Sequence, residues 1–418
     1  MDKESKIFVA GASGMVGSAI VCSLLEQGYT NIIGSYHSRK PDTSLFFSDE
    51  YNASSITDHS SLITHKLDLT DQHQVRDFFA EHRPEYVFLA AAQVGGILAN
   101  NKYRADFIYL NTQMQNNVIE QSYEHEVKKL LFLGSSCIYP KECPQPMREE
   151  HLLTGPLEYT NEPYATAKIS GMKMCESYNL QYGTNFVSVM PTNLYGPGDN
   201  FDLETSHVLP ALIRKFHLGK CLEQEDWQAI REDLDKRPIA GVDGSAADKA
   251  IIETLASYGI SLNASHDSRL TPYESSSLIT DNSSQVTVQL WGTGTPKREF
   301  MYSQDMARAC LHVMNQVDFS DIVRDRNGAD PSQASEVRNC HVNIGTGREI
   351  SISDLADLAS QEVGFQGNVD FDPSMPDGTP RKLLDVSRLQ SLGYEAETGL
   401  KEGVRKLYAW YRSDTSIE

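Results

Sequence analysis

The chain lacks the features that mark disulfide-rich, zinc-binding and membrane-spanning proteins. Its seven cysteines, at positions 22, 137, 143, 175, 221, 310 and 340, form no C-x-x-C pair, so neither a disulfide framework nor a metal site is indicated. No apolar stretch approaches the ~18 residues that a membrane span requires, and the charged start MDKESK leads directly into a strand-like run. These absences predict a cytoplasmic protein in a reducing compartment.

Positive charge is also scarce. The 418 residues include 37 Lys and Arg against 57 Asp and Glu, which gives a formal net charge of −20. This balance argues against nucleic acid or an anionic membrane as the main partner, because few cations are available to neutralise phosphates. An anionic small substrate would therefore need a local cationic pocket.

Short apolar runs alternate with amphipathic stretches in the first half of the chain. The strand-like runs are KIFVA (6–10), NIIGS (31–35), HKLDL (65–69), YVFLA (86–90), KLLFL (129–133) and FVSVM (186–190), and long helices are expected over 104–126 and 163–182. Strands rich in Val, Ile, Phe and Leu that are separated by helices predict βαβ units. The expected fold is α/β, with a doubly wound parallel sheet of the Rossmann type.

The regular alternation ends near residue 193, where Pro, Gly and Asn cluster. We expect a Rossmann domain over 1–192, to which 298–316 and 340–346 return, and a smaller C-terminal α/β substrate domain over 193–297 and 347–418. Residues 221–285 are acidic, and a structureless connection of this length would be unusual. We expect a partly helical surface insertion there, and a lid, an oligomer contact and inert decoration all stay open as its role.

The sequence GASGMVG follows the first strand and opens a helix, which is the setting of a dinucleotide-binding turn. Glycines there allow a tight turn and let the backbone approach a pyrophosphate held at the helix N-terminus. The residues of this loop are Gly11, Ala12, Ser13, Gly14, Met15, Val16 and Gly17. Further along, Asp68 and Leu69 follow a strand-like run and are suited to an adenine contact.

Residues beyond the glycine loop favour NADP(H) over NAD. An NAD enzyme usually offers a carboxylate to the ribose 2′-hydroxyl about 20 residues after the glycines, whereas this chain offers Ser35, His37, Arg39 and Lys40. Cations pair with a 2′-phosphate that a carboxylate would repel. The alternative is a solvated basic turn.

Tyr164 and Lys168 lie in the sequence YATAK, and their i, i+4 spacing puts both side chains on one helix face. An ammonium beside the phenol would lower the pKa of the tyrosine and make it usable as an acid or base near neutrality. Ser135, just past the run KLLFL, could bind the same substrate oxygen. Cys137 follows two residues later, where ligands bind in open α/β sheets; its alternative role is a small buried filler.

With these motifs the chain resembles the extended short-chain dehydrogenase/reductases, and further segments narrow the resemblance to the GDP-L-fucose synthase family. These segments are AAAQVGGILANN (90–101), LGSSCIYPKECPQPM (133–147), NEPYATAK (161–168), MPTNLYGPGDNF (190–201), SHVLPALIRKF (206–216), WGTGTPKREF (291–300) and PDGTPRKLLDV (376–386). The resemblance implies C3 and C5 epimerisation and NADPH-dependent C4 reduction of GDP-4-keto-6-deoxy-D-mannose to GDP-L-fucose. It also implies a homodimer formed through the two long helices. Ser13 departs from bacterial members, which often have a basic residue there.

The resemblance also assigns roles to individual residues. Catalysis would fall on Ser135, Cys137, Tyr164, Lys168 and His207, with the thiol as base and the imidazole as acid. Cofactor contacts would include the glycine loop, the basic cluster, Asp68 and Leu69. The further cofactor contacts would come from Ala90, Ala91, Ala92, Leu133, Gly134, Ser135, Ser136, Tyr164, Lys168, Pro191, Thr192, Asn193, Leu194 and His207. Substrate contacts would come from Ser136, Cys137, Asn193, Lys215, Trp291, Arg298, Asp377 and Arg381.

The chemistry explains why such an enzyme would need Cys137 and His207 as a second acid–base pair. Both epimerised carbons flank the C4 ketone, so inversion needs a base on one ring face and a proton donor on the other. For His207 the alternative is a structural histidine, and for Trp291 a core aromatic. Rival functions are a GDP-L-colitose synthase that epimerises only C5, a C4 epimerase that recycles NAD, and a non-catalytic dinucleotide-binding module.

Overall fold

The computed structural model describes residues 1–41, 61–262, 286–327 and 336–413. The described residues divide into two compact units. The first comprises Met1–Asp199, Arg298–Glu349 and Arg381–Gly403, and the second comprises Asn200–Lys297, Ile350–Pro380 and the chain from Val404 onward. The domain bounds expected from the sequence stay a prediction.

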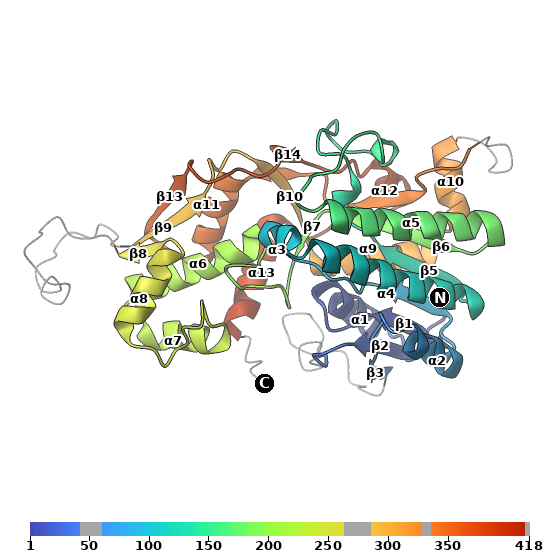
Figure 1. Ribbon diagram of the computed structural model, residues 1–418, viewed down its shortest axis with the longest axis horizontal. Helices are drawn as coiled ribbons and strands as arrows, with labels where there is room; N and C mark the ends of the chain where they lie inside the picture. Colours follow the sequence, from blue (N-terminus) through green and yellow to red (C-terminus); the bar gives the residue numbers. More distant parts are fainter. Residues whose placement is uncertain (42–60, 263–285, 328–335, 414–418) are drawn as a thin grey trace, which may run out of the picture. The chain divides into compact units, whose positions relative to one another are not determined.

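A seven-stranded parallel sheet forms the centre of the first unit, in the order β11-β6-β5-β4-β1-β2-β3 (Figure 1). The strands are β1 (Ile7–Ala10), β2 (Ile32–Tyr36), β3 (Leu62–Lys66), β4 (Tyr86–Leu89), β5 (Lys129–Leu133), β6 (Phe186–Pro191) and β11 (His341–Ile344). The order 3-2-1-4-5-6 of the first six strands is that of Rossmann folds. The predicted fold class is therefore confirmed.

Helices cover both faces of this sheet. One buried cluster joins the sheet to helices that carry Ile20, Leu24 and Leu311, and a second joins the opposite face to helices that carry Val118 and Met172. The first face has α1 (Met15–Glu26) and α9 (Ser303–Gln316), and the second has α2 (Gln72–His82), α4 (Arg104–Glu124) and α5 (Glu162–Tyr182). Because both faces are covered, strands such as β5 read as continuous apolar runs.

Local signals start and end these helices. Asp71 caps α2, since its Oδ1 accepts hydrogen bonds from the backbone N of His73 at 2.9 Å and of Gln74 at 3.2 Å. Pro163 lies in the first turn of α5, and Gly183 ends the helix with φ of +70°, a conformation that glycine adopts readily. The two long helices lie within two residues of their predicted ends.

Strand β3 lies three residues before the predicted run at 65–69. It pairs with β2 from Leu62, opposite Ile32, to Lys66, opposite Tyr36. Leu67 and its neighbour Leu69 are buried beyond the strand end, in the cluster that contains the phenylalanines of α2. The apolar residues that suggested a strand therefore pack under a helix instead.

A second, small sheet has β10 between β12 and β14, and β10 also pairs in parallel with β7. These strands are β7 (Asn193–Tyr195), β10 (Lys297–Tyr302), β12 (Glu349–Ser351) and β14 (Arg381–Lys382). The remaining short or terminal elements are α3 (Ile97–Lys102), η5 (Ser136–Ile138), η6 (Glu149–His151), α10 (Phe319–Asn327), α12 (Ser387–Ser391) and α13 (Leu400–Ser413). None of the described helices combines the length and apolar character needed to cross a lipid bilayer.

The second unit has a three-stranded sheet in the order β13-β9-β8, against which α6 packs. Strand β9 (Val286–Trp291) is parallel to β13 (Asn368–Asp372) and antiparallel to β8 (Ile260–Leu262). The helices α6 (Val208–Glu223) and α11 (Ile352–Val363) contact each other. The rings of Phe216 and Phe365 stack here, with centroids 5.5 Å apart.

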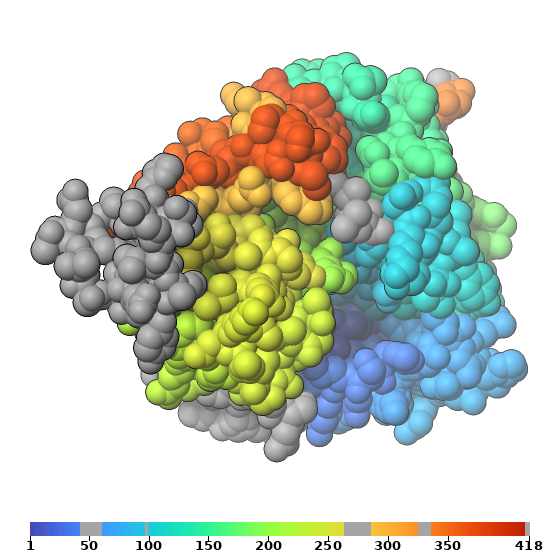
Figure 2. All heavy atoms as spheres, turned by 60° about the vertical axis from the view of Figure 1, so that its left-hand side comes forward, coloured from blue at the N-terminus to red at the C-terminus, as the bar shows by residue number. Residues whose placement is uncertain are grey.

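The predicted insertion at 221–285 is partly helical, as expected, but it contains more structure than the sequence suggested. The chain forms two helices there, α7 (Trp227–Lys236) and α8 (Asp248–Ser257), and the short strand β8 follows them. Each helix buries two aliphatic side chains, Ile230 and Leu234 in α7 and Ile251 and Leu255 in α8. Their outer faces appear in yellow on the surface in Figure 2. Residues 263–285 lie outside the described residues.

Candidate active site

Two glycines shape the turn between β1 and α1 by letting backbone segments approach closely. Gly11 has φ of +86°, and a Cβ there would lie 2.8 Å from the Cα of Ala91. A Cβ on Gly17 would lie 2.0 Å from the carbonyl oxygen of Gly11. Substitution at either position would therefore force the turn away from its neighbours.

Gly14, between them, leaves the N-terminus of α1 accessible. It is the N-cap residue, with no side-chain cap and no acidic residue in the first turn, so the first N–H groups of the helix are available to an anion. Ala90, Ala91 and Ala92 follow β4, and the strand order reverses between β1 and β4, where dinucleotides bind in such sheets. This arrangement fits the pyrophosphate of a dinucleotide.

The predicted basic cluster begins at the end of β2, beside the glycine loop. The Oγ of Ser35 accepts a hydrogen bond from the backbone N of Gly11 at 3.2 Å. The Nη2 of Arg39 donates to the carbonyl oxygen of Ser13 at 3.4 Å, and Lys40 is exposed. A cationic side chain thus reaches the loop itself, as a 2′-phosphate site requires.

Asp68 lies just past the end of β3 and is partly engaged. One carboxylate oxygen accepts hydrogen bonds from the backbone N and hydroxyl of Thr70, at 2.9 and 2.7 Å. The other lies 3.8 Å from the Nε2 of His37. The backbone N of Asp68 donates to the Oε1 of Gln74 at 3.3 Å, and the carbonyl oxygen of Leu69 accepts from the Nδ2 of Asn117 at 2.9 Å. The adenine contact of these two residues stays a prediction.

Ser135, Cys137 and Tyr164 come together at the junction of β5 and α5. The Oγ of Ser135 accepts a hydrogen bond from the backbone N of Cys137 at 3.2 Å, and the Tyr164 hydroxyl is hydrogen-bonded to Ser135. Burial, and next the charge of the Cys137 side chain, raise the pKa of Tyr164, while the bond to Ser135 opposes the rise. The phenol consequently stays protonated and can act as a proton donor.

The expected lowering of the tyrosine pKa by Lys168 is wrong for this arrangement. Lys168 is 3% exposed, and burial lowers its own pKa to about 7. Its Nζ donates to the carbonyl oxygen of Leu133 at 2.8 Å and lies 5.9 Å from the ring centroid of Tyr164. The desolvation of both groups thus outweighs the ammonium–phenol attraction.

Two residues that the sequence did not single out as partners contact the thiol of Cys137. The Nδ2 of Asn161 lies 3.4 Å from its Sγ, and the Nζ of Lys382 lies 3.5 Å from it. Asn161 was visible as a polar residue three positions before Tyr164. Lys382 gave no such signal, because 245 residues separate it from Cys137.

The other predicted cofactor residues of the first unit border the C-terminal ends of β5 and β6. Gly134 donates its backbone N–H to the carbonyl oxygen of Val189 at 2.8 Å, and Ser136 is buried. After Pro191, Thr192 donates its backbone N–H to Ile344 at 2.9 Å. The Nδ2 of Asn193 donates to the carbonyl oxygen of Glu299 at 2.8 Å, and Leu194 lies in β7.

Two predicted substrate residues of the first unit are arginines in the small sheet. Arg298 lies in β10 beside the buried Glu299. Arg381 lies in β14, and its Nε donates to the Oε2 of Glu349 at 2.6 Å.

In the second unit, the predicted substrate residues gather along β9. The Nζ of Lys215 donates to the carbonyl oxygen of Gln289 at 3.1 Å, and burial lowers the lysine pKa to about 8. Asp377 accepts hydrogen bonds from the backbone N and hydroxyl of Thr293, at 2.9 and 2.7 Å. Trp291, between them at the end of β9, is 58% exposed, so its alternative role as a core aromatic is excluded.

His207 is the N-cap residue of α6 in the second unit, whereas Cys137 belongs to the first. Their pairing across a substrate ring stays a prediction. Within the described ranges, no group of three or more His, Cys, Asp or Glu side chains could hold a metal ion.

The parallel sheet, the glycine loop and the Ser135–Tyr164–Lys168 arrangement define a dinucleotide-dependent enzyme of the short-chain dehydrogenase/reductase type. The chain belongs to the NAD dependent epimerase/dehydratase family, whose model matches residues 7–236 and 252–327.

Individual relatives narrow this assignment and confirm the predicted resemblance. GDP-L-fucose synthase 1 of Arabidopsis thaliana is 42% identical over 410 residues, which cover 98% of this chain and 94% of the relative. GDP-L-fucose synthase of Escherichia coli strain K12 is 40% identical over 408 residues, covering 98% and 97%. Among solved structures, a GDP-D-glycero-L-gluco-heptose synthase from Campylobacter jejuni in the presence of NADPH is 37% identical, with a TM-score of 0.78 and 99% of each chain covered.

Proposed function

We propose that the protein converts GDP-4-keto-6-deoxy-D-mannose to GDP-L-fucose by epimerisation at C3 and C5 and NADPH-dependent reduction at C4. The observation that carries this proposal is the position of Cys137 within one group with Ser135 and Tyr164. A reductase, or a C4 epimerase that recycles NAD, requires only the serine, tyrosine and lysine. An additional thiol beside them supplies the base that proton abstraction from carbon requires.

The reductive half of the reaction would use the phenol as an acid. Bound NADPH supplies the hydride that adds to C4. Tyr164, held protonated, donates its proton to the C4 oxygen as negative charge develops there, and Ser135 donates a hydrogen bond to the same oxygen. Lys168 ties α5 to the end of β5 through Leu133 and thereby fixes the tyrosine.

The epimerising half would use the same oxygen site before reduction. The Cys137 thiolate removes the proton from C3 or C5, and the electron pair moves onto the C4 oxygen as an enolate, where Ser135 and Tyr164 stabilise it. His207 would then protonate the carbon from the other ring face. Before the next inversion the proton held on sulfur returns to solvent and His207 takes up a proton from solvent, so atoms and charge balance.

The residues along β9 would hold the GDP end of the substrate. An exposed indole at Trp291 offers a stacking surface for guanine. Lys215 would supply a cation of the kind that a pyrophosphate requires in a chain of net charge −20. Asp377 would accept hydrogen bonds from a hydroxyl-bearing group.

A second candidate substrate class is a GDP-4-keto-heptose. The solved heptose synthase from Campylobacter jejuni is 37% identical to this chain across 99% of both chains, close to the 40–42% identity of the GDP-L-fucose synthases above. The same acid–base groups would serve a heptose, because the added carbon lies beyond C5.

We further propose a cytoplasmic homodimer. All seven cysteines are free, which suits a reducing compartment. Several large apolar side chains are exposed on the two long helices, including Ile108 and Tyr109 on α4 and Leu180 and Tyr182 on α5. Burying these against a second copy would remove apolar area from water.

The test of the proposed function is incubation with NADPH and GDP-4-keto-6-deoxy-D-mannose in D₂O, followed by identification of the product sugar by NMR. We expect GDP-L-fucose with deuterium at C3 and C5. In Cys137→Ser, deuterium incorporation should fall by about 10²–10⁴-fold, while NADPH binding stays unchanged; Cys143→Ser, in a buried cysteine of the same loop, is the matched control. Reduction without deuterium at either carbon would contradict the proposal.

A further inference from the structure

The thiol of Cys137 is contacted by two nitrogen donors from distant parts of the first unit. The Nδ2 of Asn161 lies 3.4 Å from Sγ, and the Nζ of Lys382 lies 3.5 Å from it. Nearby, the Oγ of Ser135 accepts a hydrogen bond from the backbone N of Cys137, and Tyr164 on the first turn of α5 interacts electrostatically with the Cys137 side chain. Lysine is the one cation of this set, and it faces the sulfur.

The side chain of Asn161 does not cap the helix that it precedes. It is the N-cap residue of α5, where an asparagine side-chain oxygen commonly accepts a hydrogen bond from a first-turn N–H. Here there is no side-chain cap, and within the described part of the chain its buried Oδ1 has no hydrogen-bond partner. The backbone N of Asn161 is instead held by the Oε2 of Glu158, at 3.2 Å. The amide is thus oriented toward the sulfur rather than toward its own helix.

The backbone that carries Lys382 is fixed to the loop that follows Cys137. The backbone N of Met147 donates to the carbonyl oxygen of Leu383 at 2.7 Å, and the backbone N of Asp385 donates to the carbonyl oxygen of Met147 at 2.8 Å. The backbone N of Leu384 donates to the Oε2 of the buried Glu299 at 3.0 Å. These backbone hydrogen bonds fix the chain around residue 382 and so restrict where the Lys382 ammonium can lie.

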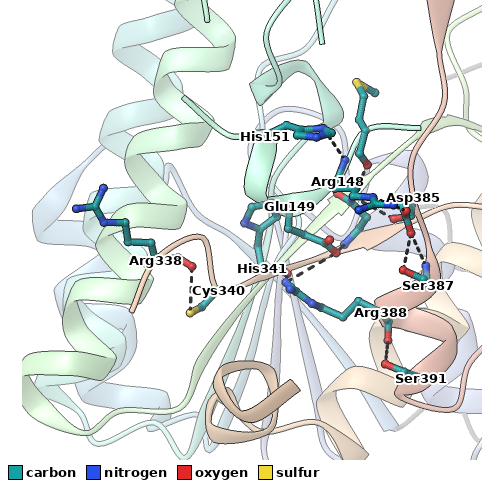
Figure 3. Close-up of polar contacts among 12 residues, drawn as sticks. Arg148, Glu149, His151, Arg338, Cys340, His341, Asp385, Ser387, Arg388 and Ser391 are labelled. Atoms are coloured by element: carbon teal, nitrogen blue, oxygen red, sulfur yellow. Dashed lines mark hydrogen bonds and ion pairs between the residues drawn. The ribbon is translucent and has the colours of Figure 1, made fainter. Parts of the chain in front are cut away.

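Side chains reinforce this junction (Figure 3). The Nε of Arg148 donates to the Oδ2 of Asp385 at 3.2 Å, and the Nη1 of Arg388 lies 3.9 Å from the Oε1 of Glu149. The same Arg388 nitrogen donates to the carbonyl oxygen of His341 at 2.7 Å, which ties the junction to β11.

We propose that Lys382 and Asn161 are positioning residues that hold the Cys137 side chain as an oriented thiolate. An ammonium beside a cysteine favours the thiolate over the thiol, and an amide N–H that donates to a charged sulfur makes a stronger hydrogen bond than one to a neutral sulfur. Lys382 and Asn161 thereby determine the fraction of enzyme molecules in which Cys137 is a thiolate that can remove a proton from carbon. This inference rests on the proposed function of Cys137 as the base.

The direct test is the rate at which iodoacetamide alkylates Cys137 in the free enzyme. The other six cysteines are buried, and mass spectrometry of the modified peptide isolates the residue. Near neutral pH, Lys382→Met should slow alkylation by about tenfold, and Lys382→Arg should restore most of the rate because it keeps the charge. Asn161→Ala should slow it by a smaller factor. Lys141→Met, which removes an exposed lysine from the same loop, should leave it unchanged.

The pH profile and the kinetic constants separate this role from a purely structural or substrate-binding one. The alkylation profile of Lys382→Met should move to higher pH, and deuterium exchange at C3 and C5 should fall in kcat. A higher KM with an unchanged alkylation rate would show that Lys382 binds substrate instead, and would overturn the inference. If Lys382→Met fails to fold, unchanged alkylation in Asn161→Ala would overturn it equally.

The outcomes also distinguish this inference from the proposed function. Slower alkylation in the variants, together with no turnover of any GDP-4-keto sugar by the wild type, would leave the thiolate inference standing and remove the function. Turnover with deuterium exchange, together with no effect of the variants on alkylation, would leave the proposed function standing and remove the thiolate inference.

Discussion

The Nζ of Lys168 donates a hydrogen bond to the carbonyl oxygen of Leu133 at 2.8 Å, joining the first turns of α5 to the end of β5. This bond places an ammonium among buried residues, and burial lowers the lysine pKa from 10.5 to about 7. The charged form of Lys168 is thus disfavoured in the folded state. A group that ties α5 to the end of β5 therefore reduces the stability of the fold.

Lys168→Met should stabilise the fold while it abolishes reduction. Below about pH 7 the folded lysine is protonated and the cost of burying its charge is present in full, so the free energy of unfolding should rise by about 1 kcal/mol or more in the variant. Between pH 7 and pH 10.5 the unfolded chain binds the proton and the folded chain does not, so wild-type stability rises with pH. The gain from the substitution should shrink across that range.

Thermal unfolding of the two proteins across this pH range checks the prediction. Lys141→Met, at an exposed lysine, is the control and should change little at any pH. A loss of stability in Lys168→Met below pH 7 would mean that the bond to Leu133 outweighs the burial of charge.

Tyr164→Phe should distinguish the contribution of the phenol's proton to catalysis from the contribution of its ring to packing. The ring contacts Phe107 edge to face, with centroids 6.4 Å apart, and phenylalanine retains this contact. Loss of the hydroxyl should lower kcat for NADPH oxidation by about 10²–10⁴-fold, and should also slow deuterium exchange because the enolate oxygen loses a donor. Stopped-flow and NMR measure the two rates. Tyr159→Phe, in the exposed loop before α5, is the control, and equal effects of both substitutions would contradict the assigned role.

Arg39→Met should weaken binding of NADPH but not of NADH. The guanidinium reaches the glycine loop through Ser13, and a charge-assisted contact to the 2′-phosphate is worth about 1.5 kcal/mol or more, so the Kd for NADPH should rise by about tenfold. Fluorescence titration with both cofactors measures the ratio. Arg76→Met, at an exposed arginine of α2 paired with Asp77, is the matched control. An equal loss of affinity for both cofactors would place Arg39 elsewhere than at the 2′-phosphate.

The sequence was most informative where one local pattern determined both backbone and chemistry. The glycine loop is recognisable from its own seven residues, because Gly17 approaches the backbone of Gly11 within the same turn; only the approach of Gly11 to Ala91, which follows β4, depends on a distant segment. Strands whose two faces are both covered by helices appear in the sequence as uninterrupted apolar runs. Such strands can therefore also be predicted from a local pattern. The serine, the tyrosine and their lysine were found from a strand end and a helical spacing.

The sequence was least informative where packing between distant segments decides. Leu67 and Leu69 mimic a strand, yet they are buried under α2, because the sheet partner of β2 begins at Leu62. The tyrosine pKa followed desolvation rather than the neighbouring ammonium. The contact of Lys382 with Cys137 depends on a junction between two loops, and no periodicity along the chain records it.

A buried ion pair inside the second unit should control the stability of the helices around it. Arg214 of α6 is 0% exposed and Asp233 of α7 is 4% exposed; the Nε and Nη2 of the arginine lie 3.0 and 2.9 Å from the Oδ1 of the aspartate. The hydroxyl of Tyr411 donates to the other carboxylate oxygen, and burial raises the pKa of this tyrosine. The carboxylate is thus shared by α6, α7 and α13.

Removing one member of this group should cost more than removing both charges. Asp233→Ala leaves the Arg214 guanidinium buried beside an empty site, so the free energy of unfolding should fall by about 3–5 kcal/mol, whereas the double variant Arg214→Met with Asp233→Leu should lose much less. The exposed pair of Lys249 and Glu253, 3.8 Å apart, offers the comparison, since Lys249→Ala should cost less than about 0.5 kcal/mol. Urea unfolding measures the totals, and hydrogen exchange should show the loss in α6 and α7. If the double variant were as unstable as the single one, shape complementarity rather than charge would hold these helices together.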